Sequence, residues 1–373
     1  TQSTWGREMN WLARGVEELG HRRPLVHLII RLKSSQNDAI NRAASRTPLE
    51  NQFETWTHLL KPGQFTSSDV DTALRSQVDP DLALDIFRWT SQQRHYKHDH
   101  ITYHTMLESL VQGKRYRQAE SIVEEILAGA CSPSLPLYNA TIKFCCTRKY
   151  FLHRGFDVYK KMYSSRDCKP DLHTYSLLIS ALLRRFSNQV RVSFVYLHAV
   201  RSLYRQMNAR GIIPDLYLLN MVIKAFCYCN EVNEAMLVFR DMGLYGCCPD
   251  GHSYGYIIMG MCGKGRVSSA LEFYKEMRKK EIAVPSAKCY MILVSSLAVD
   301  RRIDEALKVT EAMLNHPMSP DFLTYKTVLE GVCNEGQTSK AFDLLEEWRR
   351  KDRGMKEKTY KSLLDNLHFI NEK

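Results

Sequence analysis

The sequence has no apolar run of about 18 residues, the length that a membrane-spanning helix requires, so we expect no membrane span. It contains 11 cysteines but no C-x-x-C pair, and no cysteine has histidine or cysteine neighbours at the spacing of a zinc site. We therefore expect reduced thiols, no bound metal and no other cofactor.

The sequence patterns of common enzymes are also missing. There is no P-loop and no glycine fingerprint for dinucleotides. The H-x-E and P-C-x-x-C motifs of zinc deaminases are absent too. The chain ends soon after its last repeat, where we expect no further catalytic domain. These observations predict a non-catalytic protein without a small-molecule substrate.

Acidic residues are fewer than basic ones. There are 41 aspartates and glutamates against 52 lysines and arginines, so the formal net charge is +11 and the sequence pI about 9.0. Such an excess favours a polyanionic partner such as a nucleic acid.

The dominant feature of the sequence is an internal repeat. An anchor residue, seven times tyrosine and once leucine, returns every 35 to 44 residues at Tyr103, Tyr138, Tyr175, Leu219, Tyr254, Tyr290, Tyr325 and Tyr360. Sixteen residues after five of these anchors stands an alanine, at Ala119, Ala235, Ala270, Ala306 and Ala341. A bulky apolar residue follows each alanine by seven positions. A period in this range indicates one supersecondary unit that is stacked many times.

Residues 287–321 illustrate the unit. Apolar residues recur at helical spacing at Tyr290, Leu293, Val294 and Leu297, and again from Ile303 to Met313. A polar break separates the two stripes, and Pro320 ends the second one. Each unit is therefore predicted to be two antiparallel helices with a short, often glycine-containing turn. Because such a hairpin cannot bury its own apolar face, the hairpins must stack into an α-solenoid.

These units resemble the plain class of the pentatricopeptide repeat (PPR) family. The resemblance rests on segments such as "FLTYKTVLEGVCNEGQTSKAFDLLEEWRRK" and on Pro-Asp pairs that end at Asp171, Asp215, Asp250 and Asp321. It implies an all-α, right-handed solenoid over 65–373, built from a degenerate repeat (65–99), seven repeats (100–134, 135–171, 172–215, 216–250, 251–286, 287–321 and 322–356) and a capping helix (357–373). Residues 1–64 fall outside the resemblance, and we expect a helical extension that caps the first repeat or docks on a partner.

The resemblance also implies a function. Members of the family bind single-stranded RNA in organelles, one nucleotide per repeat. They read each base with the residue after the anchor, assisted by the last residue of the repeat. The expected reading pairs are Asn139 with Asp171, Ser176 with Asp215, and Asn220 with Asp250, and His104 occupies the same reading position. The two asparagine pairs match the pattern that favours uracil, and the serine pair resembles one that favours guanine.

At the other repeats the reading pairs depart from the family's pattern, as with Gly255 and Ser286 or Met291 and Asp321. The family also places a wedge residue two positions before the anchor, where this chain has His173, Tyr217 and His252. These three rings either stack on bases or are ordinary exposed side chains.

Two basic segments are further candidates for phosphate contacts. The repeat 172–215 carries an insertion with Arg184, Arg185 and Arg191 among aromatic residues. We expect lengthened helices there that project a basic and aromatic knob, unless the aromatic rings pack inside the hairpin. Near the end of the chain, Arg349, Arg350 and Lys351 either contact phosphates or lie on a solvated helix.

Three interpretable pairs discriminate poorly between transcripts. We therefore predict an RNA-binding structural component of a large ribonucleoprotein, the mitochondrial ribosome, with rRNA and ribosomal proteins as partners. A free factor selecting an organellar mRNA and a protein-only scaffold are the alternatives. The family favours the mitochondrion ahead of the plastid, and the start at Thr1 rather than methionine would fit removal of an import peptide.

Overall fold

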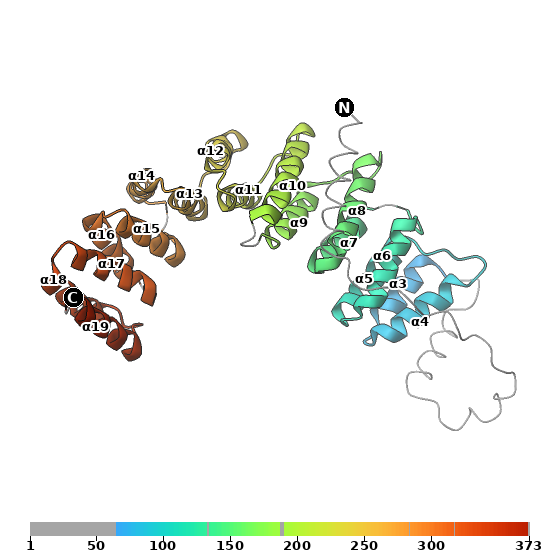
Figure 1. Cartoon of the computed structure of the whole chain (residues 1–373). Coiled ribbons are helices and arrows are strands. Elements are labelled where there is room, and N and C mark those ends of the chain that lie inside the picture. Colours follow the sequence, from blue (N-terminus) through green and yellow to red (C-terminus); the bar gives the residue numbers. More distant parts are fainter. Residues whose placement is uncertain (1–64, 133, 187–189, 283, 317, 372–373) are drawn as a thin grey trace, which may run out of the picture. The chain divides into compact units, whose positions relative to one another are not determined.

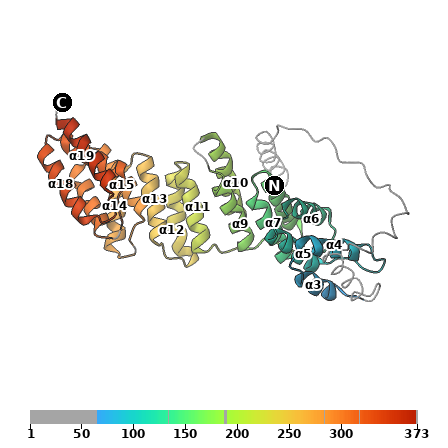
Figure 2. The same ribbon diagram turned by 90° about the horizontal axis from the view of Figure 1, so that it is seen from below.

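The computed structural model describes residues 65–371 apart from 133, 187–189, 283 and 317. Every regular element in this part of the chain is a helix, which confirms the all-α prediction. The chain divides into two compact units, one up to Ala181 and one from Leu182. Each unit is a run of paired helices (Figures 1 and 2). The expected extension over 1–64 lies outside the described residues.

The helices of the first unit are α3 (Ser67–Arg75), α4 (Pro80–Ser91), α5 (His100–Gln112), α6 (Tyr116–Ala128), α7 (Leu135–Thr147), the 3-10 turn η2 (Lys149–Phe151), α8 (Leu152–Ser164) and α9 (Leu172–Leu183), which ends just past the division. Those of the second unit are α10 (Val190–Ala209), α11 (Leu216–Tyr228), α12 (Val232–Asp241), the 3-10 turn η3 (Met242–Tyr245), α13 (Gly251–Gly263), α14 (Val267–Lys279), α15 (Ala287–Val299), α16 (Ile303–Leu314), α17 (Phe322–Asn334), α18 (Thr338–Lys351) and α19 (Glu357–Asn371).

Hairpins stack through their first helices. In the first unit α3 packs on α5 and α5 on α7, while in the second α11, α13, α15, α17 and α19 pack in series. Each second helix packs on the first helix of its own hairpin, as α14 does on α13 and α16 on α15. Within each unit the fold is therefore the predicted solenoid of helical hairpins.

The repeating sequence columns form the core. The anchors Tyr175 and Tyr290 are fully buried, whereas Tyr360 on the last helix, α19, is half-buried. All five alanines of the predicted column have no exposed surface. A methyl group at this position lets the two helices approach closely, and the bulky column that follows, such as Met277, fills the space behind it.

The aspartate that closes a repeat is the N-cap of the next first helix. The carboxylate of Asp215 accepts a hydrogen bond from the backbone N–H of Leu218, and Asp321 accepts one from Thr324, each at 2.8 Å. This cap satisfies a backbone donor that has no partner within the helix. The anchor follows one turn later, so the cap also fixes where the first helix begins.

The turn inside most hairpins uses a left-handed residue eleven positions after the anchor. Gly265 and Gly336 take this conformation at φ +72° and +77°, and Arg301 takes it at φ 57°. Gly113, which the sequence also places in a turn, has φ −77° and lies against Pro80 instead. The turn geometry therefore repeats even where glycine does not.

The insertion in 172–215 lengthens one helix only. We expected both helices to be longer, but α9 has 12 residues and α10 has 20. The first helix stops because the backbone N–H groups of Arg185 and Phe186 bond back to the carbonyls of Leu182 and Leu183, three residues earlier, which tightens the chain into a turn. Among the described residues no helix combines the length and apolarity needed to cross a bilayer.

Candidate nucleic-acid interface

Asn139 on α7 is held by two side chains at the start of α9. Its amide Nδ2 donates to Asp171 Oδ1 at 3.2 Å, and its Oδ1 accepts from the hydroxyl of Thr174 at 2.7 Å. Asp171 Oδ1 also accepts from the backbone N–H of Thr174 at 2.8 Å. The three residues form what we call the Asn139 triad, in which the helix cap and the amide share one carboxylate.

The second unit contains the same arrangement. Asn220 Nδ2 on α11 donates to Asp250 Oδ1 at 3.1 Å, and Asn220 Oδ1 accepts from the hydroxyl of Ser253 at 2.6 Å. Asp250 Oδ1 accepts from the backbone N–H of Ser253 at 2.8 Å. We call this set the Asn220 triad. Two of the predicted pairs are thus joined by direct hydrogen bonds.

The triads determine what each amide can still bind. A primary amide has two N–H donors and an oxygen with two lone pairs. In each triad one N–H points to the aspartate and one lone pair receives the hydroxyl. One donor and one acceptor remain on a side chain of which 9% (Asn139) or 8% (Asn220) is exposed. A flipped amide would direct its oxygen at a carboxylate, so the orientation is locked.

Hydrogen bonding keeps both aspartates ionised. Burial raises the pKa of Asp171, but donors from Thr174 and Asn139 outweigh it, and the pKa lies below the ordinary value. Burial likewise raises the pKa of Asp250, and donors from Ser253 and Asn220 lower it by more. The amides therefore face a carboxylate, an acceptor without a proton of its own.

A lysine lies one helical turn beyond each reading asparagine. Lys143 follows Asn139 on α7 and Lys224 follows Asn220 on α11, and both are exposed. Neither makes an ion pair with another residue in the part of the chain that the structure describes. Sequence reasoning missed these lysines and the two triad hydroxyls. Their signals were the Asn-x-x-x-Lys spacing and the Asp-x-x-Thr/Ser capping pattern.

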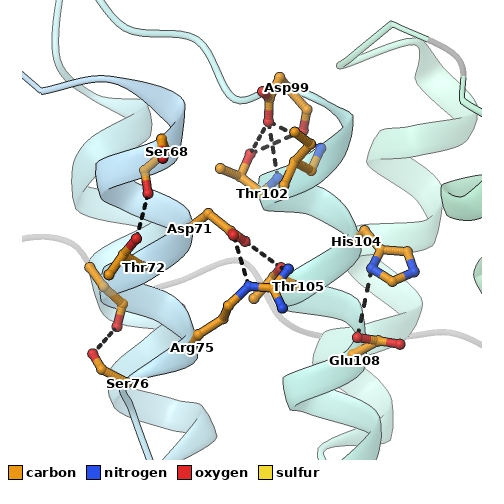
Figure 3. A network of polar contacts seen from close by, with 12 residues as sticks. Ser68, Asp71, Thr72, Arg75, Ser76, Asp99, Thr102, His104, Thr105 and Glu108 are labelled. Carbon is orange, nitrogen blue, oxygen red and sulfur yellow. Dashed lines mark hydrogen bonds and ion pairs between the residues drawn. The ribbon is translucent and has the colours of Figure 1, made fainter.

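His104, another predicted reader, makes a different contact. Its Nδ1 lies 3.7 Å from the carboxylate of Glu108 on the same helix (Figure 3). On the side of α5 that faces α3, Asp71 binds Arg75 and accepts from the hydroxyl of Thr105 (Figure 3). The contact with Glu108 thus partly occupies the polar atoms of His104.

The remaining reading positions hold no triad. Lys326 lies 3.6 Å from Glu330 on α17. Gly255 has no side chain, and a Cβ built there would meet no atom within 4 Å. Ser176 is half-buried on α9 in the first unit, and Asp215 caps α11 in the second. The predicted use of this pair stays a prediction.

The three wedge residues are exposed on the first turns of their helices, His173 on α9, Tyr217 on α11 and His252 on α13. Of these, His252 stacks on Tyr256, with ring centroids 6.2 Å apart and planes at 29°. Their contact with bases stays a prediction.

The basic residues near the end of the chain contact groups on α18 and α19. Arg349 binds the carboxylate of Glu357 at 2.8 Å and lies over the ring of Tyr360, which ties α18 to α19. Arg350 Nε donates to the carbonyl of Glu346 at 3.4 Å, and Lys351 forms an ion pair with Glu347. Arg349 thus joins the capping helix to α18, while Arg350 and Lys351 make contacts within α18.

In the inserted segment, Arg184 is exposed and Arg185 is half-buried, while the side chain of Arg191 lies outside the described residues. Phe186 packs against Tyr196 and Tyr228, with ring centroids 6.4 Å and 5.6 Å apart, so these rings pack internally. Phe194 is exposed. Among the residues that the structure describes, no three His, Cys, Asp or Glu side chains could hold a metal ion together.

Comparisons with known proteins place these features in a family. The PPR repeat family model matches 214–263, the pentatricopeptide repeat domain model 90–148, and PPR repeat models 252–282, 288–317 and 316–349. Among solved structures, the pentatricopeptide repeat protein PPR10 from maize aligns with a TM-score of 0.51 and 18% identity, over 87% of this chain and 52% of that one. This likeness concerns the fold alone.

Curated relatives come from Arabidopsis thaliana. A mitochondrial pentatricopeptide repeat-containing protein is 60% identical over 200 residues, or 54% of this chain and 52% of the relative. Another mitochondrial one is 34% identical over 180 residues, 48% of this chain and 40% of the relative. The small ribosomal subunit protein mS81 is 26% identical over 298 residues, 79% of this chain and 43% of the relative. The chain spans about half the length of such relatives. With its repeat period, its stacked hairpins and these matches, the chain belongs to the pentatricopeptide repeat family.

Proposed function

We propose that this chain is part of a non-catalytic mitochondrial protein that binds single-stranded RNA through its first helices. The observation that carries the proposal is the pair of equivalent triads. In each, a locked amide keeps one donor and one acceptor available on an otherwise buried side chain. A pyrimidine edge offers a matching acceptor and donor, so each triad can bind one such base with two hydrogen bonds.

Charge supports the same partner. The chain has a formal net charge of +11, and Lys143 and Lys224 extend beside the reading amides. An ammonium group one turn from the base-reading amide suits contact with the phosphate backbone. The mitochondrial relatives support the compartment, with the plastid as the second choice.

We further propose that the protein acts inside a large ribonucleoprotein, the mitochondrial ribosome. Each well-read base contributes ~1–3 kcal/mol, so two triads together discriminate by about 30- to 20,000-fold. That is little for finding one transcript in a pool, but it is enough to orient an RNA strand that other subunits also hold. The similarity to mS81 supports this assignment over a free transcript factor.

Two experiments test the proposal. First, the full chain is titrated with short single-stranded oligoribonucleotides, and Asn139→Ala and Asn220→Ala should each weaken discrimination at one nucleotide. A uniform loss with unrelated RNAs, or an affinity that does not change with salt, would favour a protein scaffold instead. Second, native sedimentation with and without nuclease should place the protein with ribosomal particles. Migration in ribosome-free fractions would favour the free factor.

A further inference from the structure

The two triads differ in their surroundings, because a frame of aromatic and cationic side chains (Tyr217, Lys224, His252 and Tyr256) flanks the Asn220 triad. On α11, Tyr217 precedes Asn220 by three residues and Lys224 follows it by four, so the three side chains share one helix face. Tyr217 is 61% exposed. On the adjacent helix α13, His252 follows Asp250 by two residues, and its backbone N–H bonds to the Asp250 carboxylate at 3.0 Å. Tyr217 thus lies on the helix that carries Asn220, and His252 lies in the first turn of the helix that Asp250 caps.

Tyr256 holds two members of this frame. Its ring stacks on His252 at 6.2 Å and receives the ammonium of Lys224 at 5.4 Å from the centroid. Tyr256 is half-buried between these groups, while Lys224 and His252 are exposed. A cation near an aromatic face is attracted by the ring's quadrupole, which restricts a long, flexible side chain. The lysine is therefore positioned beside Asn220 before any ligand arrives.

The Asn139 triad lacks this support. It has the same amide, carboxylate, hydroxyl and lysine, and the exposed His173 corresponds to His252. However, Pro136 stands where the second site has Tyr217, and Leu177 where it has Tyr256. Neither residue has an aromatic ring that could attract a cation. Lys143 makes no cation–π contact with any described residue. The two sites are a natural matched pair that share hydrogen-bonding chemistry and differ in aromatic content.

We propose that the Asn220 site binds its pyrimidine nucleotide much more tightly than the Asn139 site does, because Tyr256 positions His252 and Lys224 around that nucleotide. The amide of Asn220 reads the base edge, the exposed rings of Tyr217 and His252 cover the base, and Lys224 meets the adjoining phosphate. In this arrangement Tyr256 is a positioning residue. The inference rests on the proposed RNA binding and identifies the Asn220 site as the tighter of the two base-binding sites.

The test uses the full chain and oligouridylate, whose bases suit both triads. Asn220→Ala should weaken binding about 5- to 100-fold more than Asn139→Ala, the range expected when base stacking is lost together with reading. Tyr256→Leu, which copies the residue type of Leu177, should remove most of that difference. Lys224→Gln should lower the slope of log affinity against log salt by about one. It should cost less in a chain that already carries Tyr256→Leu, since the ammonium is then no longer held.

A merely structural role for Tyr256 would lower thermal stability and affect both sites alike. The thermal midpoint of every variant is therefore measured, and the decisive readout is the ratio between the effects of the two asparagine substitutions. Pro136→Tyr combined with Leu177→Tyr provides the converse, and should raise affinity at the Asn139 site. Equal losses for both asparagine variants, with an unchanged ratio in Tyr256→Leu, overturn the inference while RNA binding stands. A wild-type chain that binds neither oligouridylate nor a random RNA pool overturns the proposed function as well.

Discussion

Asp250 both caps a helix and binds Asn220, and comparison with Asp321, which caps a helix without such a partner, separates these two roles. Asp250 caps α13 and also accepts from Asn220, whereas Asp321 caps α17 through Thr324 but has Met291 at its reading position. A methionine side chain has no N–H to donate. Substitution of Asp321 by alanine should therefore cost the cap alone, ~1 kcal/mol. Asp250→Ala should cost a cap that also accepts from the backbone N–H of His252, together with the hydrogen bond from Asn220, ~2–4 kcal/mol in total.

The measurement reports on single helices, because the two caps lie in different hairpins and each stabilises its own helix. Amide hydrogen exchange in the first turns of α13 and α17 gives the local opening free energy at each cap. The comparison is made at pH 7, where the lowered pKa of Asp250 leaves its carboxylate ionised and its stabilisation complete. That contribution is lost only as the pH falls through the folded-state pKa. Equal losses of protection in the two variants would show that the contact with Asn220 adds nothing, and the triads would then be caps rather than locked amides.

Three further predictions concern the fold. Gly265→Ala should lower the free energy of unfolding by about 1 kcal/mol, because φ is +72° there although a Cβ would meet no atom. Arg301→Gly, at the equivalent position with φ 57°, should raise it, and urea titration measures both changes. Ala270→Leu should cost ~1–3 kcal/mol by separating two helices at a position with no exposed surface, and a thermal midpoint equal to that of the wild type would contradict the close packing. Burial lowers the pKa of His98 to about 4, so the unfolded chain binds this proton before the folded chain does as the pH falls. The free energy of unfolding should therefore decrease by about 3 kcal/mol between pH 6.5 and 4, measured by near-ultraviolet circular dichroism. The decrease should be absent in His98→Gln.

The repeat period was sufficient to predict the helical hairpins. Tyr290 and Ala306 recur in register, and a side chain that must be buried once per unit leaves a periodic trace in the sequence whatever its neighbours are. The Pro-Asp pairs were recognised in the sequence as the ends of repeats. Their role as N-caps, found in the structure, is also local, because each carboxylate accepts from a backbone N–H three residues away. Interactions between residues close in the sequence, and those that recur once per repeat, can therefore be predicted from the sequence.

The site depended on contacts between repeats, about 30 residues apart, which no local pattern specifies. The sequence pointed to Asn139 with Asp171, but only the packing of helices from successive hairpins brought in Thr174 and locked the amide. Packing between α18 and α19 likewise directed Arg349 into its contact with Glu357, whereas the contact of His104 with Glu108 lies within one helix. The sequence alone could not show which of these side chains already have partners within the protein and which are available to contact RNA. The sequence by itself thus determined the hairpin and its repetition, because both follow from short-range periodicity. The tertiary structure decided which polar groups remain available, because that depends on partners supplied by the neighbouring hairpin.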